Sequence, residues 1–299
     1  MVSEVLRLDR VSGGVIAVLT ASVVVVLSGC GGSRSSHSPA APPRHFTLAS
    51  FSAANFVSRT VPVNRWLPAR PGLQWLRVGT TEIGHRAVPH RVLSTVTDVV
   101  KTIDGVRAVA VLDQDIDAGQ ITQESIDWWA QDRSGNVWSL GSYTEEYEGG
   151  RFSLRRDAWL AGVQGGTPGI LMPADPSPRA PAWTIAKPPG ADPDAAQAVA
   201  LGQRECVSFN CYSGVVVIRE GKASALNNEF KFYAPGTGQI LNSPQRFSHH
   251  KDVESLANMI QLTPAGLAEL SAEALRLEHH ARVTSSDVYG RSAPAHRVR

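Results

Sequence analysis

The sequence predicts an α+β protein that is mainly antiparallel β, an open or half β-barrel meander covered by C-terminal helices. Between residues 73 and 147, β-like segments follow one another with Gly, Asn and Asp turns between them and no intervening helical pattern. A parallel sheet needs crossover helices between its strands, so this order disfavours one. Helical spacing of apolar residues is found instead near the C-terminus, from Leu267 to Ala281.

Five strands are expected in this part of the chain, at residues 73–84, 86–103, 106–112, 121–132 and 136–147. Residues 106–112, and also 215–218, carry apolar side chains on both strand faces, so something must cover each face. One cover is a helix that begins after Thr263, a good N-cap, with Pro264 in its first turn. A second helix is expected at about residues 252–262. The other face must close on itself as a barrel or hold a ligand.

Eight of the nineteen prolines lie between Pro168 and Pro193. Proline cannot donate to a central ladder, so the sequence predicts an ordered loop or edge segment that crosses the sheet. It is either a lid or a long surface loop without a role.

The N-terminus has the pattern of a secretory signal, because residues 11–27 are almost wholly apolar and follow Arg7 and Arg10. The run ends in Leu27-Ser28-Gly29-Cys30 and resembles the lipobox of bacterial lipoproteins. That resemblance implies cleavage before Cys30, diacylglycerol on its sulfur, and a mature chain of about 270 residues tethered to the extracytoplasmic face of the cell membrane. An uncleaved anchor over residues 11–27 is the alternative.

The two remaining cysteines, Cys206 and Cys211, form an even pair, and the oxidising compartment predicts a disulfide between them. Two reduced thiols or half of a metal site are disfavoured, because neither a second Cys pair nor an ordered His cluster accompanies them. The predicted organisation is a signal peptide over 1–29, the lipidated Cys and a flexible tether over 30–65, a β-rich domain over 66–245, C-terminal helices over 246–285 and a tail over 286–299.

The charge pattern disfavours nucleic acid as a partner. The net charge is +2, only 19% of the residues are charged, and the sequence has no basic stripe with interleaved aromatic residues.

An acidic run at residues 111–124 raises the question of a calcium site. Asp113, Asp115, Asp117 and Glu124 occupy positions 1, 3, 5 and 12 of an EF-hand loop. The required Gly at position 6 is displaced, because Ala118 stands there and Gly119 follows it, and the flanks are strand-like. We therefore expect a β-hairpin that turns at residues 117–119, with no bound metal and no melting shift in calcium.

Other catalytic and metal-binding chemistry is not expected. The sequence has no nucleophile elbow, phosphate loop, HExxH or dinucleotide fingerprint, so neither an enzyme nor a cofactor is predicted. The adjacent histidines 249–250 and 279–280 are poor joint metal ligands, because neighbouring helical residues diverge by about 100°. An acid and base pair for glycoside hydrolysis would have to come from five carboxylates: Asp127, Asp132, Glu145, Glu146 and Glu148.

Three segments resemble those of a known group of proteins: WWAQDRSGNVWSLG, AGVQGGTPGILMPADP and EFKFYAPGTGQIL. They are similar to a large group of uncharacterised bacterial exported lipoproteins with DxxGNVW and YAPGxG motifs, over roughly residues 73–241. More distantly, the chain resembles the LolA-type lipoprotein carriers, whose half-barrel wraps a helix and an apolar ligand. The motif residues themselves are typical of turns.

The sequence therefore predicts a membrane-anchored, non-catalytic lipoprotein that binds a lipid or another apolar or amphiphilic ligand, because its two-sided apolar strands need a cover. A structural or protein-interaction lipoprotein of the cell envelope, with an unknown protein partner, is the alternative. A hydrolase is the third class. An apolar cavity would favour the carrier, a solid core the scaffold, and carboxylates paired in a cleft the enzyme.

Overall fold

Long alternating segments rich in β-branched and aromatic residues form the strands of this chain. The computed structural model describes residues 50–57, 62–244 and 253–298, all of which belong to one unit of the chain, residues 43–299. After a 3-10 turn at Ala53–Asn55, the five expected strands are present as β1 to β5. Their bounds are β1 Leu73–Ile83, β2 Arg86–Ile103, β3 Val106–Asp117, β4 Gln120–Gln131 and β5 Val137–Glu148.

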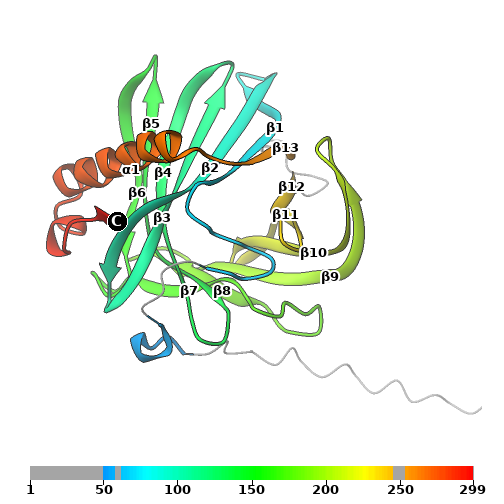
Figure 1. Ribbon diagram of the computed structural model, residues 1–299, viewed down its shortest axis with the longest axis horizontal. Coiled ribbons are helices and arrows are strands. Elements are labelled where there is room, and N and C mark those ends of the chain that lie inside the picture. The colour runs from blue at the N-terminus through cyan, green and yellow to red at the C-terminus, as the bar shows by residue number, and fades with distance from the viewer. Residues whose placement is uncertain (1–49, 58–61, 245–252, 299) are drawn as a thin grey trace, which may run out of the picture. The chain divides into compact units, whose positions relative to one another are not determined.

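The rest of the chain adds further strands and one long helix (Figure 1). The strands are β6 Arg151–Leu160, β7 Thr167–Met172, β8 Trp183–Lys187, β9 Asp194–Cys206, β10 Cys211–Lys222, β11 Ala225–Ala234, β12 Gly238–Pro244, β13 Val253–Gln261 and β14 His296–Arg297. The helix is α1 Pro264–Thr284, and a second 3-10 turn covers Tyr289–Arg291.

The sheet closes into a barrel, so the expected open or half barrel is wrong. The strand order runs β1-β13-β12-β11-β10-β9-β8-β7-β5-β4-β3-β2, and β1 also pairs with β2, which gives a ring of twelve antiparallel strands. Two strands lie off the ring: β6 extends the edge of β5, and β14 pairs with the second half of β2. The fold is therefore mainly β, and one helix rather than several covers it.

Two segments that were expected to be something else complete the ring. Residues 252–262 were predicted as a helix, but their described part is the strand β13, which pairs with β1 on one side and β12 on the other. The proline-rich segment was expected to be a loop or an edge, yet it supplies β7 and β8. Their ladders are short, and β7 and β8 pair through only Thr167 and Pro168 with Lys187 and Ala186. This segment is a wall of the barrel.

Helix α1 lies along the outer face of β2 to β5 (Figure 1). The side chain of Thr263 accepts a hydrogen bond from the Gly266 backbone N–H, as expected of an N-cap. Ala274, Leu277 and Ala281 belong to the same buried apolar cluster as Ala110 of β3 and Trp128 of β4, two strands that α1 contacts. Among the residues described, no helix is both long and apolar enough to cross a membrane.

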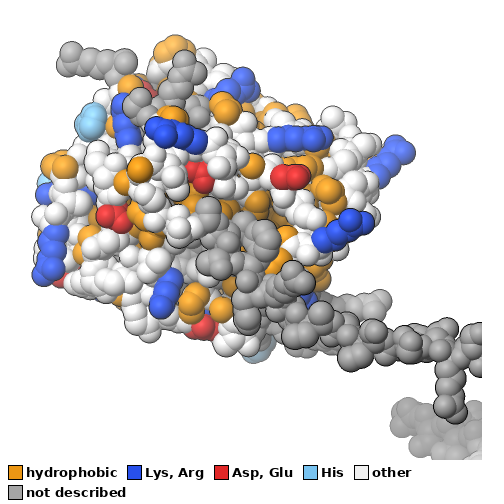
Figure 2. Space-filling view, turned by 90° about the horizontal axis from the view of Figure 1, so that it is seen from below, with side chains coloured by type: hydrophobic (Ala, Val, Ile, Leu, Met, Phe, Trp, Pro, Cys, Tyr) orange, Lys and Arg blue, Asp and Glu red, His pale blue; other side chains and the backbone are white. Residues whose placement is uncertain are grey.

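Alternation along β3 assigns the two faces of the sheet. Ala108, Ala110 and Leu112 pack under α1, whereas Val109 and Val111 belong to a second apolar cluster inside the barrel. On the outer face shown in Figure 2, Lys and Arg side chains are scattered among hydrophobic and polar ones and do not form a stripe. The site described next lies on the inner face.

Candidate functional site in the barrel interior

The barrel interior contains a cavity of about 730 Å³ that is open to solvent. The inner face of the barrel changes from apolar to acidic along β3. On β3, Val109 and Val111 face inward and are fully buried, and the next inward positions are Asp113 and Asp115. The inward apolar residues form a cluster with Trp75, Val96, Val215, Ile240 and Leu256. Of this cluster, Trp75 and the adjoining Trp129 reach the cavity, and Leu67, Trp159, Leu171 and Ile185 add further apolar lining. The space is therefore bounded by these apolar side chains and by charged groups.

An ion pair joins β1 to β13 in this wall. Arg77 Nε donates to Glu254 Oε2 at 2.7 Å, and Arg77 Nη2 donates to Ser94 Oγ at 2.9 Å. All three residues are buried. Burial opposes ionisation of Glu254, but the Arg77 guanidinium and His90 outweigh it and hold the pKa of Glu254 at about 2. Both members of the pair are charged at neutral pH.

A second cation, Lys231 on β11, is held by two carboxylates. Its Nζ lies 2.8 Å from Glu220 Oε2 and 3.3 Å from Glu229 Oε1. Desolvation works against the charge, yet these carboxylates raise the pKa of Lys231 well above its usual value. Tyr233 donates to Glu220 Oε1 at 3.4 Å.

Three further carboxyl groups lie along the inner face of β3 and β4. Desolvation by the barrel raises the pKa of Asp127 to about 7, and the nearby carboxylate of Asp113 adds to the effect. The same two causes, burial first, raise the pKa of Asp115 to about 7. Burial also raises the pKa of Asp113, although Arg77 opposes the shift. Asp115 and Asp127 are therefore partly protonated near neutral pH.

A smaller hollow of about 320 Å³ lies at the rim of β2 to β5. Asp115, Asp117, Glu146 and Glu148 line it, together with His90. His90 Nδ1 lies 2.6 Å from Asp117 Oδ1, and His90 Nε2 lies 3.8 Å from Glu254 Oε1 in the wall of the larger cavity. The acidic character of the interior thus continues to the rim.

The acidic run is a hairpin, as expected. Ala118 and Gly119 both have positive φ, 49° and 88°, and Asp117 pairs with Gln120 across the turn. The three aspartates lie on the inner face, but Glu124 lies on the outer face and bonds to Gln114 and Arg276. The sheet therefore separates the fourth EF-hand ligand from the other three. No group of three or more metal-ligating side chains is found among the described residues.

The five carboxylates considered for acid and base chemistry do not gather at one site. Glu146 and Glu148 both line the rim hollow, whereas Asp127 faces the cavity. Asp132 belongs to the DxxGNVW turn, where it accepts from the Asn136 backbone N–H at 2.9 Å and from Trp138 Nε1 at 2.8 Å. That motif is structural.

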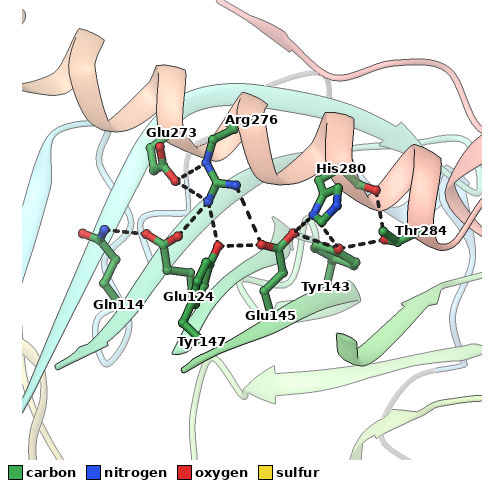
Figure 3. A network of polar contacts seen from close by, with 9 residues as sticks. All are labelled: Gln114, Glu124, Tyr143, Glu145, Tyr147, Glu273, Arg276, His280 and Thr284. Carbon is green, nitrogen blue, oxygen red and sulfur yellow. Dashed lines mark hydrogen bonds and ion pairs between the residues drawn. The ribbon is translucent and has the colours of Figure 1, made fainter. Parts of the chain in front are cut away.

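Glu145 is fully buried on the other side of the sheet, in a polar network between β3, β4, β5 and α1 (Figure 3). It accepts from Tyr143 at 2.8 Å and Tyr147 at 2.5 Å, and His280 Nδ1 lies 2.5 Å from it. Arg276 bonds to Glu124 and Tyr147 at the other end of the network. These contacts satisfy the polar groups that the helix buries, so the network attaches α1 to the barrel.

The remaining predicted site residues have the following positions. Cys206 and Cys211 are joined by a disulfide where β9 and β10 meet. His280 lies in the network under α1, and His279 is exposed on the same helix. Cys30, the signal peptide, most of the tether and His249-His250 lie outside the described residues.

Sequence reasoning missed most of the charged wall of the cavity, namely Arg77, Lys231, Glu220 and Glu254. A signal was present in EFKFY, where Glu229, Lys231 and Tyr233 alternate with two phenylalanines. Such alternation predicts opposite faces for the two sets, but not that the polar set faces inward.

Comparison with known proteins yields little similarity. No protein-family model matches the chain, and no curated protein does. Among solved structures, the chain is similar to a Bacteroides fragilis protein described as exported and of YmcC-like fold, with a TM-score of 0.32 and 11% identity over 66% of this chain and 99% of that one. A likeness at this level supports no inference about function, so the proposals below rest on the geometry of the chain itself.

Proposed function

We propose that this protein is a non-catalytic lipoprotein of the cell envelope, anchored through Cys30, which binds an amphiphilic small molecule inside its barrel. One observation carries the proposal: a cavity of about 730 Å³ whose wall combines charged groups with apolar side chains, among them Leu67, Trp75, Trp129, Trp159, Leu171 and Ile185. Small-molecule sites typically measure about 300–1,000 Å³, and the volume of this cavity lies within that range.

The cavity favours ligand binding over a purely structural role. In a barrel that serves only as a scaffold, inward side chains fill the interior as a packed core. Here charged and polar side chains surround the space instead, and their burial opposes the stability of the folded protein. The same charged groups favour a ligand with a polar end over a wholly apolar one.

The proposal is tested by titrating the purified protein with decyl glucoside, a neutral amphiphile, below its micelle concentration. Trp75, Trp129 and Trp159 line the cavity, so their fluorescence reports occupation. We expect saturable binding of one molecule per chain, and loss of binding in Ser142→Phe, because Ser142 on β5 lines the same space.

Ala191→Phe provides a second blocking variant, since Ala191 also lines the cavity but lies in an exposed loop and tolerates a large side chain more readily. Ala223→Phe is the matched control, an exposed turn residue that is not among the lining residues. Equal binding by the folded blocking variants and the control would show that the amphiphile binds elsewhere, and would overturn the proposal.

A further inference from the structure

The charged groups of the cavity also indicate the chemical class of the ligand. We propose that the polar end of the bound amphiphile is an organic cation that donates hydrogen bonds, such as a primary ammonium or a guanidinium group. This inference rests on the proposed function.

The cavity wall has a surplus of acidic groups. Three of its lining residues are basic, namely Arg77, Lys222 and Lys231. Seven are acidic, namely Asp113, Asp127, Asp157, Asp194, Glu220, Glu229 and Glu254. The rim hollow adds Asp115, Asp117, Glu146 and Glu148, so the charges of both hollows favour cations over anions.

The basic groups of the wall are already bound to acidic ones. Arg77 is paired with Glu254, Lys231 with Glu220 and Glu229, and Lys222 with Asp194 at 2.7 Å. Four of the seven acidic residues are used in these pairs. Asp113, Asp127 and Asp157 are left, and an arriving cation can compensate them without breaking an existing ion pair.

Two buried acceptor atoms in the wall have no hydrogen-bond partner within the described protein: Asp113 Oδ1 and Asn242 Oδ1. Asn242 is only 6% exposed. The strand register places Asp113 opposite Ser94, and Asn242 opposite Glu254. Because Arg77 bonds to both Ser94 and Glu254, the two acceptors flank the Arg77–Glu254 pair. Unsatisfied buried acceptors are costly, and a ligand with N–H groups is the kind that satisfies them.

Aromatic rings lie beside the unpaired acids. Trp129 is two residues from Asp127 on β4, and Trp159 is two residues from Asp157 on β6, so each pair shares the inward face of its strand. A cation held against a carboxylate is further stabilised by an adjacent indole face. A metal ion is disfavoured, because no set of three ligating side chains is found in the described part of the chain.

The test compares head groups on one tail length at pH 8: decylammonium, decyltrimethylammonium, decyl glucoside and decanoate. We expect decylammonium to bind at least about tenfold more tightly than decyl glucoside, and decanoate to bind most weakly. Decyltrimethylammonium has the charge without N–H donors and should fall between decylammonium and the glucoside. Equal or tighter binding of the glucoside or of decanoate would overturn the cation assignment and leave the proposed function standing. Binding of none of the four would overturn both.

Neutral variants locate the site. Asp127→Asn should weaken decylammonium binding about tenfold and leave decyl glucoside binding unchanged, since it removes a charge but little volume. Asp113→Asn should act in the same way and serves if the first variant does not fold. Asp175→Asn, in an exposed loop, is the matched control and should change neither affinity. Unchanged decylammonium affinity in both folded cavity variants would contradict the assignment.

Discussion

Lys101 Nζ on β2 lies 2.6 Å from Glu278 Oε1 on α1, and both side chains are almost completely buried. Lys101 also donates to the Ala293 carbonyl at 2.7 Å and lies 5.4 Å from the centre of the Tyr289 ring. The pair therefore joins the helix and the C-terminal segment to the barrel wall at one buried point.

Removal of one partner should be far more costly than removal of both. Glu278→Gln leaves the Lys101 ammonium without its counter-ion, and we expect it to lower the free energy of unfolding by about 3–5 kcal/mol. The double variant Lys101→Met, Glu278→Leu should recover most of that loss. Lys222→Met, which breaks a partly exposed pair with Asp194, is the control and should cost less than about 1 kcal/mol. Urea denaturation measures all three, and equal losses in the single and double variants would refute this account of the pair.

Local sequence patterns correctly predicted the features that are formed by residues close together in the sequence. The hairpin at Ala118-Gly119, the N-cap at Thr263 and the Cys206–Cys211 pairing all depend on residues a few positions apart, and the structure has each of them. The two-sided apolar pattern of residues 106–112 also indicated correctly that both sheet faces are covered.

Barrel closure could not be predicted in this way. It depends on β13 pairing with β1, as in Leu73 with Gln261, across most of the chain. The β13 sequence contains Glu254, Leu256 and Met259, which are good helix formers, but hydrogen bonding to two strand edges overrides that propensity. The charged interior was missed for the same reason, since inward and outward faces are distinguishable only after closure.

The cavity acids should make stability depend on pH. Asp127 and Asp115 have pKa values of about 7 in the folded protein, against 3.8 for an ordinary Asp, so between these values the folded state binds more protons than the unfolded state. Their stabilising contribution is fully present below about pH 4 and is lost as the pH rises through 7. Asp127→Asn should therefore raise the melting temperature by a few degrees at pH 8.5 and have little effect at pH 4.5. Thermal melts at both pH values, with Asp175→Asn as the control variant, test this prediction. An equal change in melting temperature at pH 4.5 and pH 8.5 would contradict the raised pKa of Asp127 in the folded protein.

The disulfide should add modest stability. Cys206 and Cys211 close a loop with a sequence separation of 5, so its loss should cost about 2 kcal/mol. Ser208 Oγ and the Phe209 backbone N–H in this loop both bond to the Leu256 carbonyl, which should hold the tip in place without the bond. The double variant Cys206→Ser, Cys211→Ser should remain folded and melt a few degrees lower. Thiol labelling of the native, non-reduced wild-type protein should find neither cysteine free, and labelling of both would contradict the pairing.

Anchoring depends on Cys30, which follows Leu27-Ser28-Gly29. We expect Cys30→Ala to move the full-length protein from the membrane fraction to a soluble or precursor form. Ser28→Ala, which keeps a small residue before the cysteine, is the control and should stay membrane-bound. Membrane retention of Cys30→Ala at mature size would mean that residues 11–27 anchor the chain as a helix.

Native mass spectrometry of the full-length protein purified from its own membranes tests the central claim, that the barrel holds an amphiphilic molecule, most directly. The account predicts one small molecule bound per chain, carrying an apolar tail and a positively charged group, and its absence from Ser142→Phe but not from Ala223→Phe. Protein that emerges without any bound small molecule, or that retains the same molecule when Ser142→Phe blocks the cavity, would contradict it.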